Sequence, residues 1–149
     1  IQLIRFCKQT KELCFAGAKN ALYYTDINNV LHKVKADRWS IGGTQHFDFP
    51  NFTKKILPKD WENIFLFSDG FQDQFGFANN KFMVGNFKKF LKKISSFSTN
   101  VQIDKMSQQF FEWKGDYTQT DDVLVVTLKK GLFTEDGSFN EEKGELVYN

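Results

Sequence analysis

Two acidic clusters, each next to a strongly apolar stretch, carry the residue type that binds hard cations. The first is IFLFSDG, residues 64–70, where four apolar residues are followed by Ser68, Asp69 and Gly70. A buried strand here would deliver the Asp69 carboxylate to its end, where Gly70 lets the backbone turn sharply. An aspartate before a glycine is also ordinary turn chemistry, so this cluster indicates a site only together with the second.

The second cluster has the reverse order. In TDDVLVVTL, residues 120–128, Asp121 and Asp122 come just before the apolar run. If the two strands are antiparallel neighbours, the end of one lies beside the beginning of the other, and Asp69 approaches Asp121. Aspartates gathered at a strand end supply the oxygen ligands that Mg²⁺ or Mn²⁺ requires. The pair therefore predicts a divalent-cation site.

Four further residues are candidates for the surroundings of this site. Gly70 gives the turn, and Asp122 stands beside Asp121 but has an alternative role as a capping or turn residue. Asp73 and Asp116 either accept hydrogen bonds from metal-bound water or are ordinary loop residues.

The first half of the chain predicts an antiparallel meander that would position the acidic strands. Apolar alternation and turn residues favour two strand pairs, and Asn28 and Asn29 mark the turn of the second. The predicted strands cover residues 1–8, 12–18, 20–26 and 30–35.

Between the two acidic clusters the apolar period changes to that of a helix. The first apolar stripe consists of Met83, Phe87, Phe90, Leu91 and Ile94, with Lys88, Lys89, Lys92 and Lys93 on the opposite face. A second helix is predicted to start with Thr99 or Asn100 as N-cap and to end at Gly115. Its predicted inner stripe is Ile103, Met106, Phe110 and Trp113.

These elements predict an α+β fold: antiparallel β-sheets with two amphipathic helices packed on one side. A chain of 149 residues fits one domain, and 41% apolar residues, with 18 phenylalanines, place it in the globular class. The domain is expected to cover residues 1–130, followed by a polar, loosely docked tail at 131–149. A net charge of +2 gives no argument for a nucleic-acid partner, and the apolar runs are too short to cross a bilayer.

Four segments, in order, resemble the metal-dependent protein phosphatases (PPM-type, protein phosphatase 2C), in their bacterial SpoIIE-like branch. They are LCFAGAKNALYY at 13–24, WSIGG at 39–43, LFSDGFQDQFG at 66–76 and TDDVLVV at 120–126. The resemblance covers residues 1–130 and matches the C-terminal part of that domain. It implies part of a β-sandwich with helices outside, and a protein serine/threonine phosphatase that uses two Mg²⁺ or Mn²⁺ ions.

In this resemblance Asp69 and Asp121 match metal ligands, and Asp122 stands where many relatives carry asparagine. The reaction it implies is attack of a metal-activated water on a phosphate monoester. It also implies a regulatory phosphoserine or phosphothreonine protein as substrate, a sensor or receiver module in the parent chain, a role in signal transduction, and a cytoplasmic location.

The family's first metal-binding aspartate, on an early strand and followed by glycine, has no counterpart before Asp69. We therefore expect a fragment of a longer protein, with little activity alone and with open sheet edges that favour a homodimer. The alternative function is a noncatalytic phosphatase-like interaction module. A third reading takes the acidic clusters as turns of an unrelated α+β domain.

Overall fold

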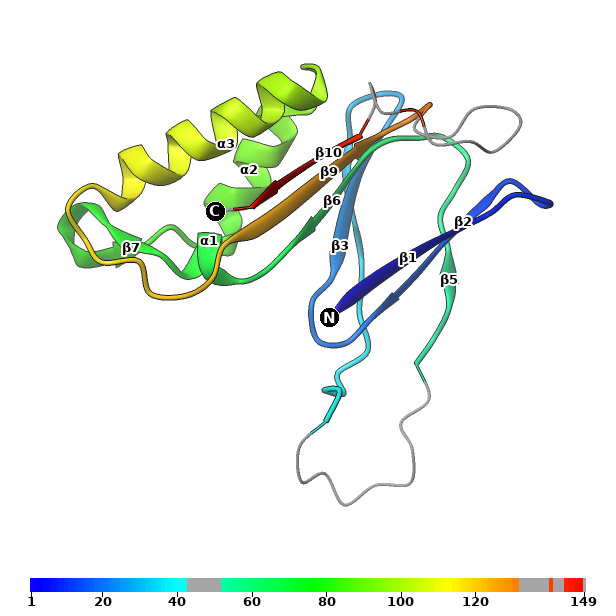
Figure 1. Ribbon diagram of the computed structural model, residues 1–149, viewed down its shortest axis with the longest axis horizontal. Helices are drawn as coiled ribbons and strands as arrows, with labels where there is room; N and C mark the ends of the chain where they lie inside the picture. Colours follow the sequence, from blue (N-terminus) through cyan, green and yellow to red (C-terminus); the bar gives the residue numbers. More distant parts are fainter. Residues whose placement is uncertain (43–51, 132–139, 141–143, 149) are drawn as a thin grey trace.

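A computed structural model describes residues 1–42, 52–131 and 140 and the backbone of 144–148 (Figure 1). Its helices are α1 (Gly70–Asp73), α2 (Val84–Ile94) and α3 (Thr99–Lys114), with a 3₁₀ turn at Phe77–Asn79. Its strands are β1 (Gln2–Cys7), β2 (Glu12–Gly17), β3 (Leu22–Asp26), β4 (Leu31–Val34), β5 (Lys55–Ile56), β6 (Trp61–Phe67), β7 (Phe75–Gly76), β8 (Asn80–Lys81), β9 (Leu124–Lys129) and β10 (Gly144–Tyr148).

A five-stranded antiparallel sheet forms the middle of the molecule, in the order β10-β9-β6-β3-β4. The two acidic clusters therefore adjoin neighbouring strands, because β6 pairs directly with β9. The predicted meander is confirmed: β3 and β4 form one hairpin, and β1 and β2 form the other.

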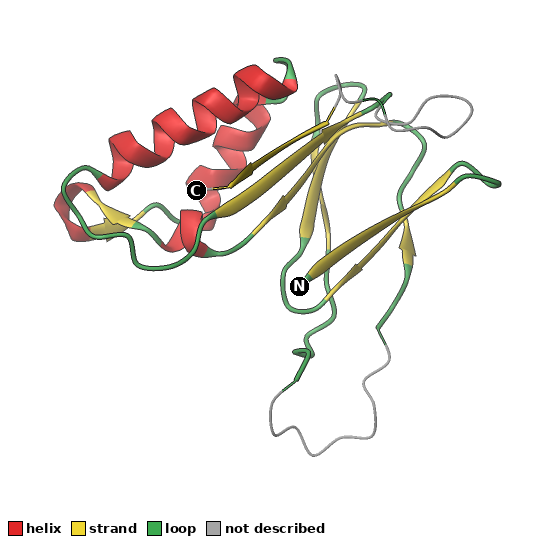
Figure 2. Cartoon of the chain, in the orientation of Figure 1, coloured by secondary structure: helices red, strands yellow, loops and turns green. Residues whose placement is uncertain are grey.

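The second sheet and the helices lie on opposite sides of the five-stranded sheet (Figure 2). The second sheet has the order β1-β2-β5, and its short strand β5 was not predicted. The predicted fold class is confirmed: antiparallel sheets with both long helices on one side.

Alternation along the central strands builds two cores, because successive side chains of a strand point to opposite faces. Tyr23 and Phe65 face the helices, whereas Tyr24 and Ile64 face the second sheet. The helix-side core consists of Tyr23, Phe65, Phe67, Phe71, Phe82, Phe87, Leu91, Ile94, Met106 and Phe110. The core between the sheets consists of Leu13, Phe15, Leu22, Tyr24, Leu57 and Ile64.

A buried polar network also joins α3 to the sheet. Gln102 of α3 donates from Nε2 to Asn63 Oδ1 at 3.0 Å and accepts at Oε1 from Thr127 Oγ1 at 2.6 Å. Asn63 in turn donates to Thr25 Oγ1 at 3.0 Å. Buried polar groups are costly unless they are paired. This network therefore holds α3 in one position relative to strands β3, β6 and β9.

Both predicted helices are present, and the four lysines of α2 are exposed as predicted. Two boundaries differ. Met83 lies outside the apolar stripe, because its φ of 72° places it before α2 and leaves its side chain exposed. The N-cap of α3 is Ser98 rather than Thr99 or Asn100.

The predicted polar tail at 131–149 requires a correction. Residues 144–148 form β10, which extends the five-stranded sheet beside β9. Gly43, the last residue of the WSIGG segment, lies outside the described residues. No helix within the described part of the chain is long and apolar enough to span a membrane.

Candidate metal centre

The junction between the end of β6 and the start of β9 is held by Ser68. The last paired residues of the ladder are Phe67 and Val125. One residue further, the Ser68 backbone N–H donates to Leu124 O at 2.9 Å. The Ser68 hydroxyl donates to Asp122 O at 2.7 Å and accepts from the Leu124 N–H at 2.9 Å. Sequence analysis missed this bridging role, which continues the pairing past the end of the strand.

Gly70 allows the two segments to approach closely on the other side of Asp69. A Cβ atom at Gly70 would lie 2.4 Å from Asp122 O and 3.2 Å from Val123 Cγ2. The backbone therefore has room only for glycine at this position. Glycine is therefore needed at position 70 for two reasons, the predicted turn and the close contact with the opposite acidic segment.

Asp69 and Asp121 consequently lie on adjoining segments. Asp69 stands between Ser68 and Gly70, and both of these touch Asp122, the direct neighbour of Asp121. Asp69, Asp121 and Asp122 are all exposed. Three carboxylates thus emerge at one end of the β6–β9 pair, which is the arrangement of backbone that the sequence predicts.

The turn at the start of β9 is organised by Asp121. Its Oδ1 accepts the Asp122 N–H at 2.7 Å, and its carbonyl oxygen accepts from Gln119 Nε2 at 2.9 Å. The turn role that sequence reasoning offered for Asp122 is thus performed by the side chain of Asp121. This bond fixes the orientation of one carboxylate oxygen at the strand end.

Asp73 and Asp116 occupy different surroundings. Asp73 ends α1, where its N–H donates to Asp69 O at 3.0 Å, and its carboxylate pairs with Lys81 Nζ at 3.2 Å. Asp116 is exposed in the loop between α3 and β9. The ion pair gives Asp73 a structural partner, whereas Asp69 and Asp121 remain the predicted metal ligands.

The donor set fits a hard cation that keeps part of its water shell. Mg²⁺ is commonly held by one or two carboxylates and several waters, and two aspartates at one exposed strand end can supply such ligands. In the described ranges no group of three or more His, Cys, Asp or Glu side chains is close enough to form a complete protein-only site.

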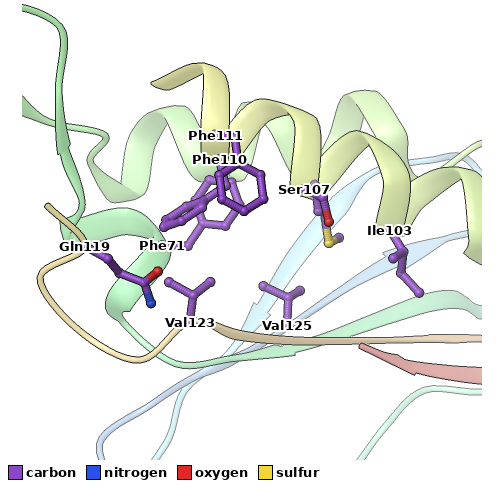
Figure 3. Close-up of a pocket in the computed structure, with 9 residues that line it drawn as sticks. Phe71, Ile103, Ser107, Phe110, Phe111, Gln119, Val123 and Val125 are labelled. Atoms are coloured by element: carbon purple, nitrogen blue, oxygen red, sulfur yellow. The ribbon is translucent and has the colours of Figure 1, made fainter. Parts of the chain in front are cut away.

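An apolar pocket of about 50 Å³ lies between α3 and the beginning of β9 (Figure 3). Its lining is aromatic and aliphatic apart from Ser107 and Gln119, so it lacks the oxygen ligands of a cation site. It is lined by Phe71, Ile103, Met106, Ser107, Phe110, Phe111, Gln119, Val123 and Val125. The acidic strand end therefore borders an apolar cavity but does not belong to it.

A fully buried side chain, Gln74, connects the segment after α1 with the loop before Asp121. It hydrogen-bonds the backbone of Thr118 and Thr120. Sequence analysis did not identify Gln74, because a single buried glutamine in an irregular segment produces no periodic pattern.

Comparison with known proteins finds similarity to a solved structure. Neither a family model nor a curated protein matches the sequence. The SiaA-PP2C domain of Pseudomonas aeruginosa aligns with 86% of this chain at a TM-score of 0.71 and 26% sequence identity. The chain spans about half the length of that neighbour, since the match covers 50% of it. Over most of its length, the chain therefore has a PPM-type phosphatase fold.

Proposed function

We propose that the chain is part of a metal-dependent protein serine/threonine phosphatase in which Asp69 and Asp121 bind a divalent ion. One observation carries the proposal: Ser68 and Gly70 hold these two aspartates on adjoining segments within a PPM-type fold. Mg²⁺ or Mn²⁺ is the ion that suits exposed carboxylate ligands.

The chain's own contribution is to fix two carboxylates at the ends of paired strands. Bound there, divalent ions would lower the pKa of a coordinated water and neutralise phosphate oxygens. The phosphoprotein substrate that we propose rests on the resemblance to the PPM-type phosphatases.

A second ion would need a bridging carboxylate, which we place elsewhere in the parent protein. The family pattern expects an Asp-Gly on an early strand, and the sequence contains no Asp-Gly before Asp69. We therefore expect one-ion binding and little turnover from this chain. By the same resemblance, we propose membership of the SpoIIE-like branch, a regulatory phosphoprotein as partner, an attached sensor or receiver module, and a cytoplasmic location in a bacterial signalling pathway.

Calorimetric titration with Mn²⁺ tests the ligand assignment. We compare the unmodified chain with Asp69→Asn and Asp121→Asn, and use Asp104→Asn as a matched control on the exposed face of α3. Loss of either proposed ligand should weaken binding by at least about tenfold. Equal affinity in all four proteins would contradict the site.

A turnover assay with a phosphoserine peptide and Mn²⁺ distinguishes the enzyme from its alternative. Weak hydrolysis that disappears in Asp69→Asn supports a phosphatase centre. Peptide binding that persists in Asp69→Asn, without hydrolysis in any protein, supports the noncatalytic interaction module. Robust hydrolysis by the unmodified chain would show that its metal centre needs no further carboxylate.

A further inference from the structure

Gln74 is fully buried, and its side-chain amide is used at both ends. Its Nε2 donates to Thr118 O at 3.0 Å and to Phe75 O at 2.9 Å. Its Oε1 accepts the Thr120 N–H at 3.3 Å. The side chain therefore hydrogen-bonds two backbone groups of the loop that leads from α3 to β9.

The backbone around Gln74 is held against the same part of the molecule. Trp113 Nε1, near the end of α3, donates to Gln74 O at 2.9 Å. A Cβ atom at Gly76 would lie 2.0 Å from Trp113 O, so the segment and the helix end are in direct contact. Gln74 is thus held in place by its surroundings and can act as a fixed support for the loop.

Gln74 gives the two acidic segments a second connection, in addition to the one through Ser68. Gln74 follows α1, which begins next to Asp69, and Thr120 immediately precedes Asp121. Residues 116–120 are themselves exposed, so their own burial contributes little to holding them in position. The bonds from Gln74 add to two others in this loop, from the Asn79 N–H to Tyr117 Oη at 3.1 Å and from Gln119 Nε2 to Asp121 O at 2.9 Å, and they are the ones that tie the loop backbone to a fully buried side chain.

We infer that Gln74 is a positioning residue, which fixes the 118–120 loop so that Asp121 stays opposite Asp69 in a geometry suited to a divalent ion. The inference rests on the proposed function, because it assigns Gln74 a role in that metal site. The role is indirect, because Gln74 acts on the loop backbone and is not itself a ligand. Its removal would nevertheless lower the affinity for the ion.

Gln102 provides a matched control. It is also a fully buried glutamine with several hydrogen bonds, but its partners are in the network of α3 and the sheet. Gln74→Leu and Gln102→Leu each remove one buried amide and leave its partners unpaired. Gln74→Asn, which keeps the amide but shortens the side chain, is the second variant in case Gln74→Leu does not fold.

The experiment combines Mn²⁺ titration with amide hydrogen exchange and thermal melting. We expect Mn²⁺ binding about tenfold weaker in the Gln74 variants, and exchange at residues 118–122 about tenfold faster. Gln102→Leu should lower the melting temperature without either change. This combination separates a positioning role from general loss of stability.

Three outcomes would overturn the inference, and they differ in what else they affect. Unchanged Mn²⁺ affinity in the Gln74 variants removes the role of Gln74 and leaves the metal site intact. Equal loss of affinity in Gln102→Leu reduces Gln74 to an ordinary stabilising residue. Absence of Mn²⁺ binding by the unmodified chain refutes the proposed site, and the inference with it.

Discussion

The hydroxyl group of Ser68 donates a hydrogen bond to the carbonyl oxygen of Asp122 at 2.7 Å, which joins the two acidic segments just beyond the last paired residues of β6 and β9. The Ser68 hydroxyl oxygen also accepts the Leu124 N–H at 2.9 Å, so one side chain satisfies a donor and an acceptor of the opposite backbone. This arrangement extends the ladder to the residues that carry the carboxylates.

Replacing Ser68 by alanine should therefore loosen the junction. Two hydrogen bonds are lost and the backbone bond from Ser68 N–H to Leu124 O remains, so we expect unfolding free energy to fall by about 1–2 kcal/mol. Urea denaturation measures this change. Ser96→Ala, at an exposed turn, is the control and should change stability by less than about 0.5 kcal/mol. Equal stability of the two variants would contradict the bridging role.

Gly70→Ala tests the close approach at the same junction. The added methyl group would lie 2.4 Å from Asp122 O, so the two backbones must separate, and we expect a loss of at least about 1–3 kcal/mol with weaker Mn²⁺ binding. Gly85→Ala is the matched control, because a Cβ there meets nothing within 4 Å and alanine in the first turn of α2 favours the helix by up to about 1 kcal/mol. In calorimetric melts we expect Gly70→Ala to lower the melting temperature and Gly85→Ala to raise it. A lower melting temperature in both variants would refute the close approach of Gly70 to Asp122.

Strands and helices with regular apolar periods were predictable from the sequence, because burial of one face repeats every two or 3.6 residues. The α2 and α3 predictions and the β1–β4 meander are confirmed on this basis. Strand β10 was missed because the polar, glycine-containing segment from 131 onward indicated a tail. Its pairing with β9 depends on tertiary contact that no local pattern records.

The site was partly predictable for the same physical reason. Antiparallel pairing of two apolar strands implies that Asp69 and Asp121 lie on adjoining segments, and the β6–β9 ladder confirms that pairing. Their binding of a metal stays a prediction. The contributions of Ser68 and Gln74 could not be derived, because both depend on hydrogen bonds between residues more than 40 positions apart.

Acidification should weaken the β3–β4 turn through Asp26. The hydrogen bond from His32, together with the Val30 and Asn28 N–H groups, holds the pKa of the Asp26 carboxyl below its ordinary value of 3.8. Since the folded-state pKa is lowered, the stabilisation is fully present above 3.8 and is lost as pH falls through the lower folded-state value.

The titration of Asp26, followed by NMR, checks this explanation. His32→Phe keeps a ring that can stack on Tyr24 and removes the hydrogen bond, so the Asp26 midpoint should rise toward its ordinary value. Asp26→Asn should lose less stability than the unmodified chain between about pH 4 and about pH 2. An Asp26 midpoint that is identical with and without His32 would show that the pair has no influence.

Phe71 belongs to the helix-side core and should be essential for stability, whereas the exposed Phe77 should not. Phe71 is 2% exposed, and its ring lies 5.1 Å from Phe87 and 5.3 Å from Phe110 between centroids, so it ties α1 to both long helices. Phe71→Ala removes this packing and should cost about 3–5 kcal/mol. Phe77, six residues later, is 81% exposed, and Phe77→Ala should change stability by less than about 0.5 kcal/mol. Urea denaturation of both variants decides the matter: a loss at Phe71 no larger than at Phe77 would mean that α1, and with it the segment that follows Asp69, is not held by this core.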